Sequence, residues 1–176
     1  MTNMDQTLKK YEELYALSKE AVADGIERIR KTDEKAHKFA TLSGLLMVVS
    51  AVGGKSVIES VVPPKNPLAW ISLVSYLLFF AAILFAFVNI LRSMRVATLG
   101  IPGMNKEVIG FFDNEEEYLD IIYALTKRNS DIVESNDALS KEKLKCLLKT
   151  YKALLWSVGL ISILVVSFIL WNIHRC

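Results

Sequence analysis

The chain has 176 residues, of which 52% are hydrophobic and 23% are charged, and its formal net charge is +2. A balance so close to zero argues against a nucleic-acid coat protein. The charges fall in two blocks: residues 1–38 carry eight basic and eight acidic side chains, and residues 92–152 carry ten of each. The long apolar segments between these blocks leave no room for a large soluble enzyme domain.

Residues 4–38 have the pattern of an amphipathic helix, interrupted only by the weak helix former Gly25. Apolar side chains recur every seven residues and share one face, with Tyr11 and Ile26 widening the stripe: Leu8, Tyr15, Val22 and Ile29. Such a stripe needs a partner, which is either a helix expected at 114–150 or the same helix in a neighbouring subunit. The polar N-terminus lacks the apolar core of a signal peptide, so we expect the chain to insert through its own spans.

Two apolar segments follow. Residues 68–91 are 24 consecutive uncharged residues, more than the roughly 20 that cross a bilayer core. Residues 39–54 are uncharged, and extension to Val62 gives a sufficient length, with Lys55 and Glu59 spaced to pair. The alternative for 39–62 is a re-entrant or interfacial helix. We favour a span because the proline-rich turn at 62–67 leads directly into 68–91, which makes a membrane hairpin.

The hairpin carries few polar groups of interest. Small residues in the first span form either a subunit or pore-lining face or a packing face within one three-helix unit: Ala40, Ser43, Gly44, Ser50, Ala51 and Gly54. Asn89 is an uncommon polar group in the second span, and a bond to a neighbouring helix would explain it.

The loop at 92–113 is the best candidate for ligand contact. Its cations Arg92, Arg95 and Lys106 can meet phosphate, and Phe111 and Phe112 can stack on a base. The alternative is that the arginines only fix the topology and the phenylalanines pack under the helices.

A second polar helix is expected after this loop, starting at a capping box formed by Asn114 and Glu117. Apolar residues follow at heptad-like spacing: Tyr118, Ile122, Leu125, Ile132 and Leu139. Asn129 and Asn136 interrupt that stripe. The helix either breaks at 135–137 or continues into a third apolar run at 153–173, which has 21 uncharged residues. No segment alternates well enough to be a strand.

Basic residues set the orientation, because they gather on the cytoplasmic side of membrane proteins. Thirteen of them flank one side of the three segments, against Lys55, Lys65 and Arg175 on the other. Residues 1–38 and 92–152 are therefore expected in the cytoplasm, with 174–176 outside. Trp70 and Trp171 would mark the outer interface, and Tyr151 and Trp156 the inner one. Cys146 and Cys176 would lie on opposite sides of the last span, which excludes a disulfide between them.

The predicted fold is thus an all-α integral membrane protein with three transmembrane helices, a cytoplasmic helical bundle and a symmetric homo-oligomeric assembly. No phosphate loop, metal-ligand spacing or catalytic triad is visible, so we expect neither an enzyme nor a cofactor. The nearest enzyme-like pattern is Arg30 and His37, at an Arg-to-His spacing seen in some helical ribonucleases. That spacing commonly arises by chance.

Several segments resemble the transmembrane effectors of bacterial Pycsar antiphage systems. The sequence at 32–36 (TDEKA), followed by 39–46 (FATLSGLL), is similar to the start of their first span. The order of parts is also similar: a hairpin, a loop with Phe111-Phe112, an acidic helix with Tyr118-Leu119, and a long helix leading to a last span. The resemblance covers most of 25–173.

The resemblance implies a membrane effector paired with a nucleotidyltransferase or cyclase. Such an effector senses a cyclic nucleotide or nucleotide oligomer, oligomerises, and impairs the bacterial inner membrane so that the infected cell dies. Three spans are too few to enclose water, so a pore would require several copies in a closed ring. Three alternatives remain: a non-conducting scaffold that recruits a partner, the ribonuclease, and a holin, against which the size of the cytoplasmic part argues.

Overall fold

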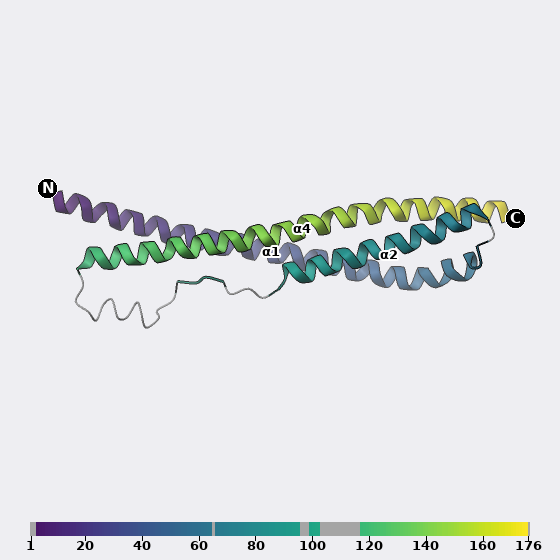
Figure 1. Cartoon of the computed structure of the whole chain (residues 1–176), viewed down its shortest axis with the longest axis horizontal. Coiled ribbons are helices and arrows are strands. Elements are labelled where there is room, and N and C mark those ends of the chain that lie inside the picture. The colour runs from purple at the N-terminus through teal and green to yellow at the C-terminus, as the bar shows by residue number, and fades with distance from the viewer. Residues whose placement is uncertain (1–2, 65, 96–98, 103–116, 176) are drawn as a thin grey trace. The chain divides into compact units, whose positions relative to one another are not determined.

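The computed structural model describes residues 3–64, 66–95, 99–102 and 117–175. These residues form three helices, α1 (Asn3–Val61), α2 (Pro67–Ser93) and α4 (Tyr118–Arg175), as Figure 1 shows. No strand occurs in the described ranges, which confirms the all-α prediction. Each of the three helices is long and apolar enough to cross a membrane, and this is consistent with a multi-pass membrane protein.

The chain divides into two compact units. Unit 1 comprises Met1–Thr32 and Val96–Glu142, and unit 2 comprises Asp33–Arg95 and Lys143–Cys176. Two helices, α1 and α4, therefore contribute a segment to each unit, while α2 belongs to unit 2 alone.

The turn between α1 and α2 lies where the sequence predicted it. Asn66 caps α2, because its side-chain oxygen accepts the backbone N–H of Ala69 at 2.9 Å. Pro67 follows at the first helical position, where its missing N–H costs nothing. At the other end, the Met94 N–H donates to the Ile90 carbonyl, and Arg92 places a cation in the last turn.

Both long helices continue through positions that favour a break. Gly25 lies inside α1, and residues 135–137 lie inside α4, so the second of the two alternatives for the polar helix is correct. The helix α4 begins at Tyr118, where the Glu117 carbonyl accepts the N–H groups of Asp120 and Ile121. The predicted cap at Asn114 lies outside the described residues.

The buried positions of α4 recur every seven residues along its whole length. Each is at most 9% exposed: Ile122, Asn129, Asn136, Lys143, Thr150, Ser157, Leu164 and Trp171. Asn129 and Asn136, predicted to interrupt the apolar stripe, are polar residues at buried positions of this series. Leu125, Ile132 and Leu139 are only partly buried. A seven-residue repeat of buried positions is typical of coiled-coil packing.

In unit 1, α1 and α4 run parallel, and their side chains contact each other at corresponding points along the two helices. The Tyr11 and Tyr123 rings meet edge to face with centroids 6.3 Å apart, and Asn129 Nδ2 donates to Ser18 Oγ at 2.9 Å. Val22 and Ile29 are 2% and 1% exposed, which confirms the inward face predicted for α1.

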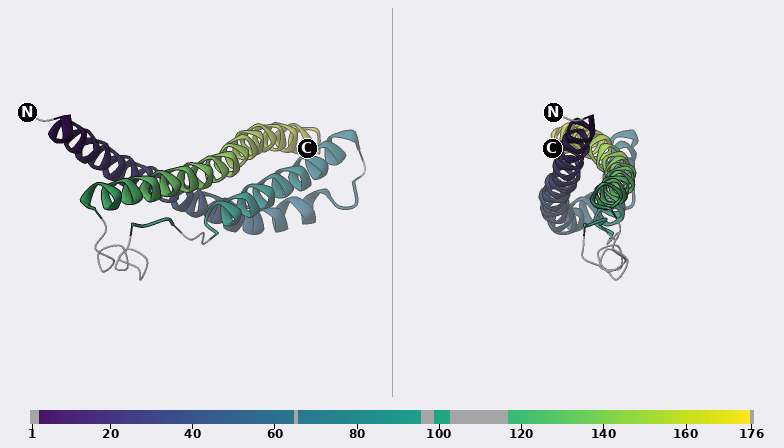
Figure 2. Two further views of the ribbon diagram at one scale, coloured as in Figure 1. Left: turned by 60° about the vertical axis from the view of Figure 1, so that its left-hand side comes forward. Right: turned by 90° about the vertical axis from the view of Figure 1, so that its left-hand side faces the viewer.

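In unit 2, α2 packs antiparallel to the segments of α1 and α4 (Figure 2). A cluster of Val61, Ala69 and Trp171 lies beside the turn, and a second cluster of Ala86, Ala153 and Leu154 lies further from it. Trp171 is packed inward against Phe168, with ring centroids 6.0 Å apart, and its predicted place at the outer membrane interface stays a prediction.

The outer surface of unit 2 is strongly apolar. Many large side chains in the apolar segments are more than half exposed, among them Leu45, Val52, Leu77, Trp156 and Val158. A contiguous surface of this kind would be unfavourable in water and is suited to contact with lipid.

Candidate functional site

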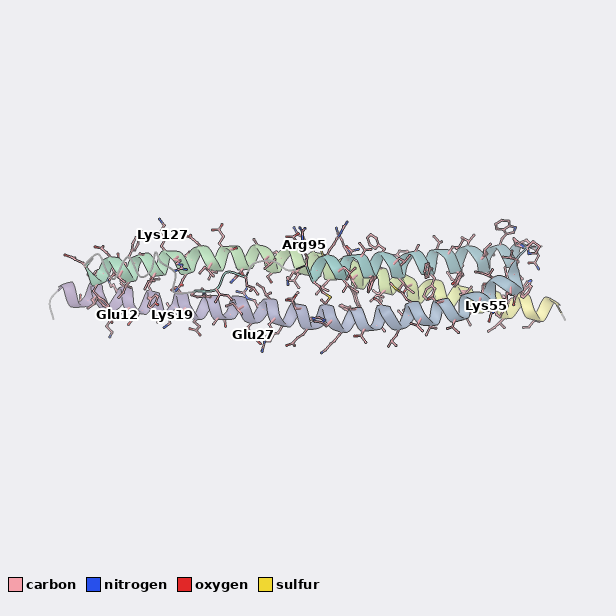
Figure 3. All side chains as sticks on the ribbon, turned by 90° about the horizontal axis from the view of Figure 1, so that it is seen from below. Glu12, Lys19, Glu27, Lys55, Arg95 and Lys127 are labelled. Atoms are coloured by element: carbon pink, nitrogen blue, oxygen red, sulfur yellow. The ribbon has the colours of Figure 1, made fainter. Side chains whose placement is uncertain are left out.

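Two of the five predicted ligand residues are described. Arg92 and Arg95 are both exposed, and Arg95 lies just beyond the last turn of α2 (Figure 3). Lys106, Phe111 and Phe112 lie outside the described residues. Gly100 and its neighbours at 99–102 are described, and they show where this loop is attached.

The loop is attached to α4 by the amide of Asn136. Asn136 Oδ1 accepts the backbone N–H of Gly100, and Asn136 Nδ2 donates to the Gly100 carbonyl, both at 3.1 Å. The Asn136 side chain is 1% exposed, so these bonds are made away from water. The backbone N–H and carbonyl of Gly100 and the two polar atoms of the Asn136 amide therefore each have a hydrogen-bond partner.

Small residues make room for this arrangement. A Cβ at Gly100 would approach Ile132 Cγ2 to 3.1 Å, and a Cβ at Gly25 would lie 3.6 Å from the Asn136 Cβ. The segment at 99–102 and the helices α1 and α4 therefore meet at Asn136 within unit 1. The described loop residues 99–102 therefore contact α4 directly.

The small-residue stripe of the first span divides between two faces. Ser43, Ser50 and Gly54 are buried inside unit 2, and Ala40 is partly buried. Ala51 is exposed, and a Cβ at Gly44 would meet nothing within 4 Å. The stripe therefore serves packing within the three-helix unit on one side and presents small residues outward on the other.

Hydroxyl groups fill the interior of unit 2 and join its helices. Ser72 Oγ and Ser167 Oγ lie 2.9 Å apart, linking α2 with α4. Tyr76 Oη donates to the Ser50 carbonyl at 3.1 Å, linking α2 with α1. Interhelical bonds of this kind contribute about 0.6 kcal/mol each in membranes.

Three further polar groups have a different environment. Asn89 is 2% exposed, and its Nδ2 donates to the Phe85 carbonyl one turn earlier in α2, so the bond found is within its own helix. In the part of the chain that the structure describes, Ser43 Oγ and Ser93 Oγ are buried without a hydrogen-bond partner. An unsatisfied buried hydroxyl costs about 1–3 kcal/mol.

A partly buried ion pair joins α1 to α4 within unit 2. Lys143 Nζ lies 2.6 Å from Asp33 Oδ1, and the two side chains are 9% and 35% exposed. Sequence reasoning counted Lys143 only as one of the cytoplasmic charges. Its place in the seven-residue series from Ile122 to Trp171 was the signal that it points inward.

Several other charged side chains of the two long helices form pairs at the surface. The Arg30 side chain donates to Glu27 at 2.9 Å and holds the pKa of that carboxyl below its ordinary value. Tyr118 Oη donates to Glu12 at 3.2 Å, which raises the pKa of the phenol. Lys55 lies 3.9 Å from Glu59, the pairing predicted from their spacing.

The ribonuclease alternative gains no support from this geometry. Arg30 is engaged with Glu27, and the His37 carbonyl accepts the Thr41 hydroxyl one turn later in α1. Both side chains are exposed on a continuous helix. Among the described residues, no group of three or more His, Cys, Asp or Glu side chains is placed to hold a metal ion.

No family model, curated protein or solved structure matches the chain.

Proposed function

We propose that this chain is a membrane effector of bacterial antiphage defence. It senses a nucleotide made by a partner nucleotidyltransferase or cyclase and, as a homo-oligomer, forms or gates a pore that impairs the inner membrane. Its N-terminus and residues 92–152 lie in the cytoplasm, and its C-terminus lies in the periplasm. The sequence resemblance motivates this proposal, and the arrangement of the helices supports it.

The single observation that carries the proposal is the continuity of α1 and α4. Each helix passes without a break from a charged segment into an apolar segment of membrane-spanning length. A helix of 58 residues extends about 87 Å at 1.5 Å per residue, so α4 reaches well beyond a bilayer core. The charged segment and the apolar segment of α4 belong to one continuous helix, which supports a link between them.

The contact between Gly100 and Asn136 gives the ligand a route to that rod. A phosphate would be held by Arg92, Arg95 and Lys106, and a base would stack on Phe111 and Phe112. The described part of that loop, 99–102, is hydrogen-bonded to α4 through Gly100. We expect α4 to have two positions, each linked to one conformation of the loop. A ligand that binds one loop conformation more tightly shifts the equilibrium between these positions, and the difference between its two binding free energies limits the size of the shift.

A pore would have to form between copies. Many hydroxyl groups lie in the described interior of unit 2, with Ser43, Ser72 and Ser157 at most 1% exposed. The outward small residues offer surfaces for close approach of a second copy, since a Cβ added at Gly44 or at Gly159 would meet nothing within 4 Å. The two unsatisfied hydroxyls, Ser43 and Ser93, are groups that a second packing arrangement could satisfy.

The test is a flux assay on the purified full chain in dye-loaded vesicles. We expect cyclic mononucleotides or cyclic oligonucleotides of one class to change dye release, and the detergent-solubilised particle to have the mass of an oligomer. Asn136→Leu should abolish the nucleotide dependence, because it detaches the loop. Asn129→Leu is the matched control, because Asn129 occupies an equivalent position but bonds Ser18 instead of the loop. A monomeric particle without flux under any nucleotide would refute the proposal.

One observation favours the alternative of a non-conducting scaffold. Unit 1 has an open, mainly apolar groove of about 520 Å³, whose lining includes Leu14, Leu17, Ala21, Tyr123 and Val133. An amphipathic helix of another protein would fit such a groove. Copurification of a second chain, together with the absence of flux, would select this alternative.

A further inference from the structure

A second groove lies in unit 2, between α2 and α4. Its volume is about 350 Å³, and its walls combine large and small apolar side chains with two lysines: Ala82, Phe85, Lys149, Lys152, Ala153 and Trp156. Phe85 and Trp156 are 56% and 73% exposed, and they line the groove together with the small residues Ala82 and Ala153. The result is a shallow apolar channel open to the surroundings of the helices.

The lysines lie at the boundary of the apolar segment of α4. Lys152 is the last charged residue before the uncharged run 153–173, and Trp171 at the far end of that run packs beside the turn of the hairpin. The groove thus begins at the polar end of the span and extends toward its apolar middle. In the proposed topology, the polar end is in the cytoplasmic leaflet.

The surroundings of the groove are basic. The helix α2 contains no acidic residue, and α4 contains none after Glu142. Lys145 precedes Lys149 by one turn on the same face of α4, and Arg92 follows Phe85 by two turns on the same face of α2. Among the described side chains, neither Lys149 nor Lys152 has a carboxylate within ion-pair distance. The charge at this end of the groove is therefore available to an external anion.

We propose that this groove binds an anionic phospholipid of the cytoplasmic leaflet. The lipid phosphate lies between Lys149 and Lys152, and an acyl chain follows the channel past Ala82 and Ala153 between the rings of Phe85 and Trp156. Basic pockets between transmembrane helices on this side of a membrane are suited to such headgroups. A lipid uses the cations and the apolar channel together, whereas a free phosphate would use the cations alone. The inference rests on the membrane topology proposed above but not on nucleotide sensing.

The experiment measures which lipids remain bound to the full chain. The protein is reconstituted with equal amounts of phosphatidylglycerol and phosphatidylcholine, extracted in mild detergent, and analysed by native mass spectrometry. We expect retained phosphatidylglycerol to exceed phosphatidylcholine in the wild type, and to fall on the order of tenfold in Lys149→Gln/Lys152→Gln. The matched control is Lys35→Gln/Lys38→Gln, which removes the same charge from exposed positions near the polar end of the first span.

Two further variants separate the lipid from a smaller anion. Ala82→Phe fills the channel and Phe85→Ala removes its exposed wall, and both leave the charge unchanged. Each should reduce the retained phosphatidylglycerol, and inorganic phosphate should not displace it. Equal loss in the control pair, or no loss in Ala82→Phe and Phe85→Ala, would overturn the inference in favour of general charge attraction or a phosphate-only site. If the protein were absent from the membrane fraction, the topology itself would be wrong.

Discussion

The ion pair between Asp33 and Lys143 allows an asymmetric prediction. The Lys143 ammonium sits in a side chain that is only 9% exposed, whereas the Asp33 carboxylate belongs to one that is 35% exposed. Removing the carboxylate therefore leaves a charge that water cannot easily reach. Removing the ammonium leaves a charge that water can partly hydrate. The two single substitutions should have unequal effects on stability, although they break the same contact.

The magnitudes follow from this difference in exposure. Loss of one partner of a fully buried pair costs about 3–5 kcal/mol, and the partial exposure of Asp33 lowers the value toward that of a surface pair. We expect Asp33→Asn to cost about 2–3 kcal/mol of unfolding free energy. Lys143→Met keeps the packing of the lysine stem and should cost about 1 kcal/mol or less. The double variant should be close to Lys143→Met alone, which gives a coupling energy of about 2 kcal/mol.

Unfolding in detergent can be followed by the loss of helical circular dichroism as denaturant is added. Wild type, both single variants and the double variant complete the thermodynamic cycle. Lys145→Met is the matched control, because Lys145 is exposed on the same helix and its loss should change stability by less than about 0.5 kcal/mol. If Lys143→Met destabilised the protein as much as Asp33→Asn, the reasoning from burial would be refuted.

Three other predictions concern packing, loop attachment and pH. Gly54→Ala should destabilise the protein by about 1 kcal/mol or more, because its Cβ would displace the Tyr76 hydroxyl from the Ser50 carbonyl. Gly44→Ala is the control, because a Cβ there would meet nothing within 4 Å. It should leave the free energy of unfolding unchanged or increase it in the same assay. Asn136→Leu should increase amide hydrogen exchange at 99–102, since two bonds worth about 1 kcal/mol each are lost, and unchanged exchange would contradict the attachment. Glu12→Gln should lower the pKa of Tyr118 to its ordinary value. The contribution of that bond to stability is complete below pH 10.0 and is lost as the pH rises through the raised pKa. The pKa of Tyr118 can be measured by absorbance titration, with Tyr118→Phe as the reference that lacks this phenol. An ordinary pKa for Tyr118 in the wild type would contradict the prediction.

The coarse fold could be read from the sequence because its signals are local. Uncharged runs indicated the apolar segments, the prolines at 62–67 indicated the turn, and the heptad of Val22 and Ile29 indicated the inward face of α1. Helix continuity at Gly25 and at 135–137 was harder to predict. Propensity disfavours a helix there, and packing between α1 and α4 outweighs it.

The polar interior could not be read in the same way. Whether Asn136 faces inward depends on what lies opposite, and the small size of Gly25 is informative only once the register of the two helices is known. The stripe from Ala40 to Gly54 was likewise mixed, because adjacent residues such as Ser43 and Gly44 point about 100° apart on a helix. Arg92 and Arg95 were correctly placed at the end of α2, but whether they contact a ligand stays a prediction.

The ion pair also limits how α1 and α4 can slide. Because their buried positions repeat every seven residues, the nearest alternative alignment lies about 10.5 Å away along the axis. That slip would bring Lys143 opposite Ile26 or Ala40 instead of Asp33 and leave an ammonium stranded among apolar groups. A longitudinal slip between the two helices therefore carries the cost of breaking the pair between Asp33 and Lys143.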